Sequence, residues 1–444
     1  MKPCPPRGPR PAAHSASPRG GRVRWVLGAW FLAVILGFST VSPAQVEYIA
    51  RFSLEKQRSL VGEPVFCIYT IQNTGAQRFQ FSYRSPSRVL NRELEQEPQF
   101  RVTDAAGRRL SDPAPRPCGG ALGTVVYGFV RLAPGQSHTE RWLLNQWARF
   151  SSPGHYRVRA ERRLPLLAVD PLTQKVSEKP AAYALTLDEL TLEVEPANEE
   201  RLQAAFQPYA AVLRNRGNPD PTEAALVVTT LPQPFLLPEL EAMASAPSPS
   251  PWDRKQALEG LARLGTPAAW EAILKVAEWR DFVPGVTGNS KDDPLRAYAT
   301  LLLAEKGDLS FLPALLAMLS TAPKELRGDI LRALGFFHDQ RVYQALFEGL
   351  HSPDPADRTN AILGLKNLGT KESIPAVMAM LNDPEAQVRQ VANFALESLT
   401  GQKFTLSGKA SHQESAHVAD QWHAWWREKG ASVVPTRPPA CHDW

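Results

Sequence analysis

A repeat of 31 residues in the second half of the chain constrains the fold more than any other sequence feature. An arginine recurs at this spacing, and apolar residues recur in phase with it. The arginines are Arg296, Arg327, Arg358 and Arg389, preceded by Arg254 if an insertion of eleven residues is allowed before Arg296. A fixed period of this length is typical of a helical solenoid, whose units bury their apolar faces only by stacking on one another.

Helical periodicity begins near Asn198. It predicts helices over 199–214, 222–231 and 236–243, the last one weak, and a proline-rich linker over 246–251 that interrupts the series. In the last clear unit, Asp383 is a predicted N-cap and Pro384 the first helical residue. This helix is expected to end at Thr400-Gly401, and its partner is predicted over 373–381.

The last unit resembles the short HEAT-like repeat, the type also found in phycobilisome lyases. The resemblance is close over residues 353–401, good over 252–352 and degenerate over 197–251. It implies an α-solenoid that serves as a binding or scaffolding surface, and it implies no lyase activity because the motif belongs to the repeat. The residues that carry it are Asp383-Pro384, Val388-Arg389, Ala392, Ala395-Leu396 and Leu399-Thr400-Gly401.

From Val46 to about Glu195 the sequence has a different pattern. Short apolar or alternating segments, rich in aromatic and β-branched residues, are separated by Gly, Pro, Asn and Asp. This pattern is typical of a β-sandwich. The predicted strands include residues 65–71, 79–83, 100–103, 124–130, 153–160, 184–187 and 192–195.

The order of these strands resembles the immunoglobulin-like domains of secreted bacterial proteins. The resemblance rests on the Asn73-Thr74-Gly75 turn, the segment 132–137 that opens a strand into Trp142, and the Pro153-Gly154-His155-Tyr156-Arg157-Val158 element. It implies that the Tyr156 ring points into the sandwich. The antibody framework of Cys, Trp and Cys is absent, so recognition by antibody-type loops has no support.

These patterns together predict a multidomain chain with an N-terminal all-β immunoglobulin-like sandwich and an all-α HEAT-like solenoid of about five to seven helical hairpins. We expect a signal peptide over residues 1–44, the β-sandwich domain over 45–196, the solenoid over 197–430 and a disordered tail over 431–444.

The N-terminal segment has the three parts of a secretory signal. Residues 1–24 hold six basic residues and no acid, the next fourteen are uncharged and largely apolar, and Ser42-Pro43-Ala44 is a cleavage site of small residues. The alternative is an uncleaved anchor, for which this apolar segment is short. We therefore expect a periplasmic or extracellular protein with no stable membrane span after cleavage.

Cleavage would also change the charge balance. The full chain has 50 basic and 45 acidic residues, and removing residues 1–44 leaves 44 and 45, a net charge of −1. A nearly neutral chain without a clustered basic face does not predict nucleic-acid binding. Three cysteines would remain, and Cys67 either pairs with Cys118 or stays buried as a free thiol, while Cys441 is left over.

Three features are candidate sites. The repeated arginines either present a positive stripe to an acidic partner or bond to carbonyl and Asp oxygens between repeats, and repetition in phase with the core favours the structural role. The insertion at 281–291 is either a partner-binding loop, with Phe282, Val283 and Val286 as the candidate contacts, or a loop that the repeat tolerates without a function. Trp422, Trp425 and Trp426 form one stripe on a predicted terminal helix, 414–429, which either caps the solenoid or binds a ligand.

No catalytic signature is present in the sequence, and the spacing of His412, His417 and His423 does not predict a metal site. No cofactor is expected. The sequence therefore predicts an exported, non-catalytic scaffold that binds an unidentified protein through the solenoid surface. The alternative is an envelope enzyme or inhibitor acting through the β-sandwich loops, for example at Cys118-Gly119-Gly120.

Overall fold

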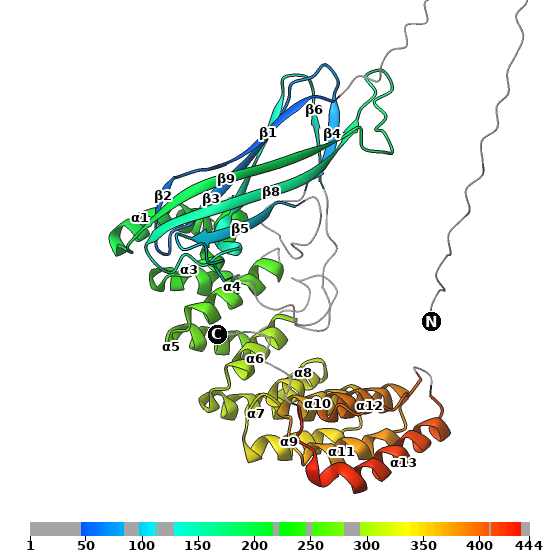
Figure 1. Ribbon diagram of the computed structural model, residues 1–444. Coiled ribbons are helices and arrows are strands. Elements are labelled where there is room, and N and C mark those ends of the chain that lie inside the picture. Colours follow the sequence, from blue (N-terminus) through cyan, green and yellow to red (C-terminus); the bar gives the residue numbers. More distant parts are fainter. Residues whose placement is uncertain are drawn as a thin grey trace, which may run out of the picture. The chain divides into compact units, whose positions relative to one another are not determined.

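The computed structural model describes residues 46–83, 97–111, 113, 128–215, 222–245, 251–278, 294–407 and 410–436. All of them belong to one compact unit, Gln45–Trp444. Strands occupy the first part of this unit and helices the second, with the change at residues 196–198 (Figure 1). We call residues 46–195 the β-strand region and residues 199–432 the helical region.

The β-strand region contains two sheets. The smaller sheet has the antiparallel order β1-β3-β7, and the larger has the order β2-β9-β8-β4-β6, with β5 paired to β8. The β2–β9 pair is parallel, whereas the other pairs are antiparallel. The strands are β1 (Tyr48–Leu54), β2 (Arg58–Leu60), β3 (Phe66–Asn73), β4 (Phe79–Tyr83), β5 (Gln99–Asp104), β6 (Gly128–Leu132), β7 (Ser137–Leu143), β8 (Gly154–Ala168) and β9 (Ala182–Glu195).

The long β8–β9 hairpin corrects one prediction. Residues 184–187 and 192–195 were predicted as separate strands, but they belong to the single strand β9. The polar residues between them do not break the strand, because the Asp188 carboxylate accepts a hydrogen bond of 2.7 Å from the backbone nitrogen of Phe52 on β1. A carboxylate bonded in this way is compatible with a continuous strand.

The two sheets share one hydrophobic core, into which Tyr156 also points, with its hydroxyl donating to the carbonyl oxygen of Ser152. An ion pair between Glu140 on β7 and Arg162 on β8 lies in the same core, with 2.9 Å between oxygen and nitrogen. Burial by itself raises the pKa of the Glu140 carboxyl, but the Arg162 guanidinium and the His138 side chain together outweigh it and hold the pKa below its ordinary value. The pair therefore connects the two sheets as a charged contact.

The helical region is a two-layered series. The even-numbered helices α2 to α12 lie side by side in one row, and each odd-numbered helix from α3 to α11 packs on the even-numbered helix that follows it. The helices are α1 (Glu199–Arg214), α2 (Thr222–Thr230), α3 (Leu237–Ser245), α4 (Pro251–Leu264), α5 (Pro267–Glu278), α6 (Pro294–Lys306), α7 (Leu312–Thr321), α8 (Lys324–Leu334), α9 (Gln340–Leu350), α10 (Pro355–Leu368), α11 (Ser373–Ala379), α12 (Ala386–Thr400) and α13 (His412–Lys429).

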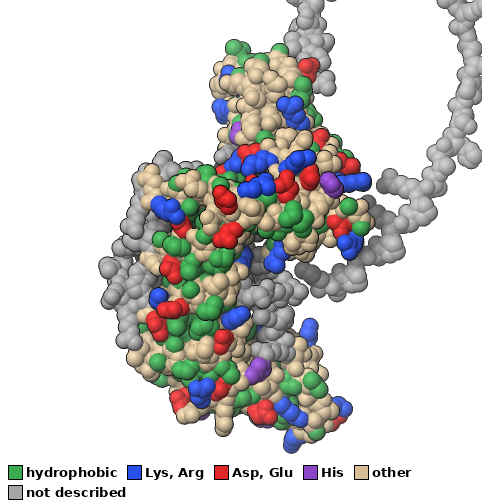
Figure 2. All heavy atoms as spheres, turned by 90° about the vertical axis from the view of Figure 1, so that its left-hand side faces the viewer, with side chains coloured by type: hydrophobic (Ala, Val, Ile, Leu, Met, Phe, Trp, Pro, Cys, Tyr) green, Lys and Arg blue, Asp and Glu red, His purple; other side chains and the backbone are tan. Residues whose placement is uncertain are grey.

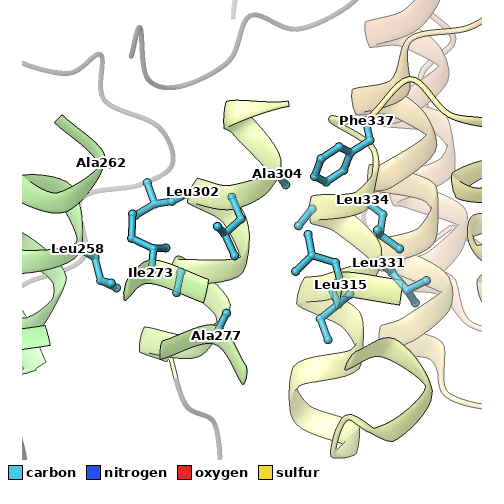
Figure 3. Close-up of a cluster of buried hydrophobic side chains, with 14 of the residues drawn as sticks. Leu258, Ala262, Ile273, Ala277, Leu302, Ala304, Leu315, Leu331, Leu334 and Phe337 are labelled. Carbon is cyan, nitrogen blue, oxygen red and sulfur yellow. The ribbon is translucent and has the colours of Figure 1, made fainter. Parts of the chain in front are cut away.

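Short 3₁₀ helices extend several of these ends: η2 (Leu144–Gln146), η3 (Pro234–Leu236), η4 (Leu309–Phe311), η5 (Met380–Asn382) and η6 (Gly430–Ser432). The apolar side chains between the layers form a continuous core that passes from one repeat to the next (Figure 3). The predicted linker at 246–251 lies mostly outside the described residues.

The start of α12 differs from the prediction. Asp383 was predicted as its N-cap, but the helix begins at Ala386 and its N-cap is Glu385. The Asp383 carboxylate accepts a hydrogen bond of 2.9 Å from the backbone nitrogen of Glu385, and it also binds Arg358 of the preceding repeat. Asp383 therefore lies two residues before the N-cap of α12, and its carboxylate contacts the preceding repeat.

The first helices pack on the β-strand region. Leu60, Phe66 and Leu143 belong to the same core cluster as Leu202 and Phe206 of α1. The guanidinium of Arg141 on β7 bonds both Glu55 and Glu223 of α2. The core of the helical region therefore starts on residues contributed by the strands.

Glycines allow α8 and α10 to approach closely. A Cβ at Gly335 would lie 2.0 Å from the carbonyl oxygen of Gly364, and a Cβ at Gly364 would lie 2.6 Å from the carbonyl oxygen of Leu331. Gly335 has φ −61° and ψ −10°, a conformation that alanine also adopts. Glycine is therefore required at position 335 because the two backbones leave no space for a Cβ atom, and not because of its backbone conformation.

Gly335→Ala should consequently lower the free energy of unfolding by about 1–3 kcal/mol, the usual cost of overpacking. Urea unfolding followed by circular dichroism measures this difference. Ser320→Ala, at an exposed position of α7, is the matched control and should leave the midpoint unchanged. Equal midpoints for both variants would show that the two backbones are not in contact.

Candidate interaction surface of the helical repeats

The repeat arginines point into the contacts between units. The Arg358 guanidinium makes a bidentate pair with Asp383, with Nε–Oδ2 and Nη2–Oδ1 distances of 2.7 and 2.9 Å. It also donates to the carbonyl oxygen of Ser352. Arg389 donates to the carbonyl oxygens of Asp383 and Ala410, and both arginines are buried. These guanidinium groups satisfy carbonyl groups of neighbouring loops.

The earlier arginines of the series make weaker forms of this contact. Arg254 and Arg296 donate from Nε to the carbonyl oxygens of Ala244 and Ala277, at 3.2 and 3.1 Å. Arg327 lies 3.5 Å from the Asp357 carboxylate, and its side chain is 42% exposed. Most guanidinium groups of the predicted positive stripe are therefore bonded to oxygen atoms of the same chain.

A different set of residues at the same period is available on the surface. Five positions after each of the last three arginines lie Arg332 on α8, Leu363 on α10 and Phe394 on α12. These helices are adjacent in the even-numbered row, so equivalent positions lie side by side. Phe394 is 55% exposed, and Leu363 is partly exposed. We call these three residues the α8–α12 ridge.

Lys366 adds a positive charge beside the ridge. Its ammonium nitrogen lies 6.0 Å from the centre of the Phe394 ring, a cation–π distance. Partial burial lowers the pKa of the Lys366 ammonium, and the nearby Arg332 lowers it further. The surface around Phe394 thus combines an exposed ring, an aliphatic side chain and two basic groups, a composition suited to a protein partner.

The opposite layer carries its own exposed ring. Phe347 on α9 is 37% exposed and stacks on Tyr343, with ring centres 6.3 Å apart. Phe347 therefore offers a control position for the ridge, since it is the same residue type in the other layer. On the face shown in Figure 2, hydrophobic side chains gather over the helical region, with charged side chains between them.

The tryptophans of the predicted terminal stripe lie on α13. Trp422 is fully buried, its ring packs edge-on against Phe404 at 4.8 Å, and its Nε1 donates to Asn393 of α12 at 2.8 Å. Trp425 and Trp426 are partly buried against the same core. The stripe closes the end of the repeat series.

The structure says less about the remaining predicted sites. Cys67 is buried, and burial raises the pKa of its thiol to about 12. Cys118 lies outside the described residues, so whether it pairs with Cys67 stays a prediction. Phe282, Val283 and Val286 also lie outside them. Within the part of the chain that is described, no cluster of three His, Cys, Asp or Glu could hold a metal ion.

Comparison with protein families identifies the repeat. A family model described as HEAT repeats matches residues 312–397, which contain α7 to the greater part of α12. The chain therefore contains HEAT repeats. Comparison with curated proteins gives no match. In the described segments, no helix has the length and apolar character required to cross a bilayer.

Solved structures with similarity are of several kinds. The CpcE–CpcF complex of phycocyanin lyase from a Nostoc species is 18% identical and has a TM-score of 0.27, over 50% of this chain and 83% of that one. Human deoxyhypusine hydroxylase is 15% identical with a TM-score of 0.19, over 51% and 91%. A β-glucosidase from Erythrobacter marinus is 15% identical with a TM-score of 0.18 over 34% of this chain, which spans 16% of that enzyme's length.

Sequence reasoning missed the ridge, because its members share only their position in the repeat. Arg332, Leu363 and Phe394 follow three repeat arginines at a fixed offset, as any equivalent positions do, and they differ in residue type. Stacking fixes the position of such residues and leaves the outward side chain free to vary. Their exposure, which the sequence does not show, is what identifies them.

Proposed function

We propose that this chain is an exported, non-catalytic scaffold that binds a protein partner through the α8–α12 ridge. The observation that carries the proposal is the exposed Phe394 ring, beside Leu363 and the basic groups of Arg332 and Lys366, on the continuous row of a HEAT-repeat series. Aromatic side chains and arginines are the residue types that most often carry the energy of a binding hot spot.

The proposal includes the N-terminal part of the chain. A cleaved signal peptide over 1–44 would place the protein in the periplasm or outside the cell. The β-strand region would be an immunoglobulin-like sandwich domain over 45–196, followed by the solenoid over 197–430 and a tail over 431–444. The shared core and the Glu140–Arg162 contact between the sheets support the sandwich, and the basic and apolar N-terminal segments support export.

The test replaces the aromatic anchor. Phe394→Glu removes the ring and places an acid on the ridge, so capture of the partner from an envelope extract should fall at least about tenfold, the loss typical of a hot-spot residue. Phe347→Glu, on the other layer, is the matched control and should capture the partner as the unchanged chain does. Circular dichroism and thermal unfolding establish that both variants fold.

Equal capture by the two variants would contradict the proposal, because the ridge would then carry no binding energy. Loss of capture by Phe347→Glu alone would move the site to the layer of odd-numbered helices. Loss by both variants with unchanged folding would show that the partner does not distinguish the layers, which also contradicts a site on the ridge.

A further inference from the structure

The outer face of the larger sheet carries exposed apolar side chains in a row. Leu185 and Leu187 on β9 are 68% and 55% exposed, and Tyr183 precedes them on the same side of the strand. One aromatic and two aliphatic side chains at three successive outward positions are unusual, because such positions on a solvated sheet are normally polar. This row of β9 therefore has the character of a contact surface.

The strand register extends this row across the sheet. Tyr183 lies opposite Pro165 on β8, and Gln80 on β4 lies opposite both Leu167 on β8 and Arg131 on β6. Residues two apart on a strand share a face, so Leu167 joins Pro165. The outer face of β8 and β9 thus presents an apolar band, which consists of Leu167, Pro165, Tyr183, Leu185 and Leu187. The exposed Phe129 on β6 is separated from this band by the polar Gln80 and Ser82 of β4.

Arginines lie on the same face, both beside the band and beyond it. Arg163 lies opposite Leu185, and its guanidinium stands over the Tyr183 ring at 4.3 Å. Further along, Arg101 on β5 lies directly opposite Arg159 on β8. Two like charges at opposed positions destabilise a sheet unless an anion lies near them.

The acids of this face do not fully compensate these charges. Glu161 lies 3.9 Å from Arg159, and Glu189 lies opposite Arg159 on β9. Arg101 and Arg157 are further basic groups of this part of the face, so Arg101, Arg157 and Arg159 outnumber the two acids Glu161 and Glu189. The face combines an apolar band with an excess of guanidinium groups.

We propose that this face binds the surface of an anionic lipid bilayer. The aliphatic and aromatic side chains of the band would enter the headgroup boundary, and the arginines beside it would contact lipid phosphates. A second copy of the chain fits less well, since it would place the positively charged face against itself. The surface is separate from the α8–α12 ridge and does not depend on the partner proposed there.

The experiment is sedimentation of the mature chain, residues 45–444, with vesicles of phosphatidylglycerol and phosphatidylcholine and with vesicles of phosphatidylcholine alone. Binding is expected to the anionic vesicles and to weaken as salt is raised. The double variant Leu185→Ser with Leu187→Ser should bind at least about tenfold more weakly. Arg101→Ser should weaken binding about fivefold, the effect of one basic group near an anionic surface.

Ile49→Ser is the matched control, because Ile49 is also exposed but lies on the smaller sheet. It should bind vesicles as the unchanged chain does, and so should Phe394→Glu. Equal binding to neutral and anionic vesicles would overturn the proposal, as would retention of binding by the double leucine variant. Dimerisation that the double variant abolishes, in the absence of vesicle binding, would assign the face to a second copy and overturn it as well.

Discussion

Arg358→Ala is expected to lower the free energy of unfolding by about 3–5 kcal/mol, because it removes one partner of a buried ion pair and leaves the other unpaired. The Asp383 carboxylate, which is buried, would keep only its bond from the backbone nitrogen of Glu385. The carbonyl oxygen of Ser352 would lose its donor as well. Urea unfolding followed by circular dichroism measures the difference.

Two further variants separate charge from geometry. Arg358→Lys keeps the charge but loses the planar fork that makes two parallel bonds to Asp383, so it should recover only part of the lost stability. Arg341→Ala is the control, since Arg341 is exposed and pairs only with Asp339 of its own helix start. Its unfolding midpoint should match that of the unchanged chain.

The outcome distinguishes the two interpretations of the arginine series. If the series served an acidic partner, Arg358→Ala would weaken binding and leave stability unchanged. If it connects the repeats, stability falls, and partner capture by the folded fraction stays the same. A stability loss below about 1 kcal/mol, the scale of an exposed ion pair, would rule out the structural role.

The 31-residue period predicted much of the helical region because one period determines many contacts. The bounds of α1 match the predicted helix, and the predicted stripe on α13 has its first member, Trp422, in the core. Helical phase is set locally by the side chains of each repeat, so it can be read from the sequence. The start of a helix is less local: α12 begins at Ala386, and Asp383, the predicted N-cap, lies before the helix and binds Arg358 of the preceding repeat.

The surfaces were harder to predict, since they depend on which neighbours cover a residue. The apolar residues of β9 alternate as a buried strand would, but Leu185 and Leu187 occupy the outward positions. Sequence alternation identifies two faces without showing which one is covered. The ridge has the same difficulty, because Phe394 is apolar and nevertheless lies outside the core.

Trp422→Ala is expected to have the other large effect, a loss of about 3–5 kcal/mol for removal of a fully buried aromatic side chain. The Asn393 side chain would lose the donor that bonds its amide oxygen, which adds to the cost. Because a repeat contacts only its neighbours, the damage should begin at the end of the series. Amide hydrogen exchange should show early loss of protection in α11 to α13 and later loss in α4 to α8.

Trp422→Phe and His423→Ala complete the comparison. Phenylalanine retains part of the packing against Phe404 but cannot donate to Asn393, so its loss should be intermediate. His423 is the exposed neighbour on α13 and should be replaceable without effect. Uniform loss of exchange protection along all repeats would mean that the series unfolds as one unit. Loss confined to the last helices would instead establish α13 as the cap of the series. The cap would then keep the terminal repeat, and with it Phe394 on the ridge, in its folded position.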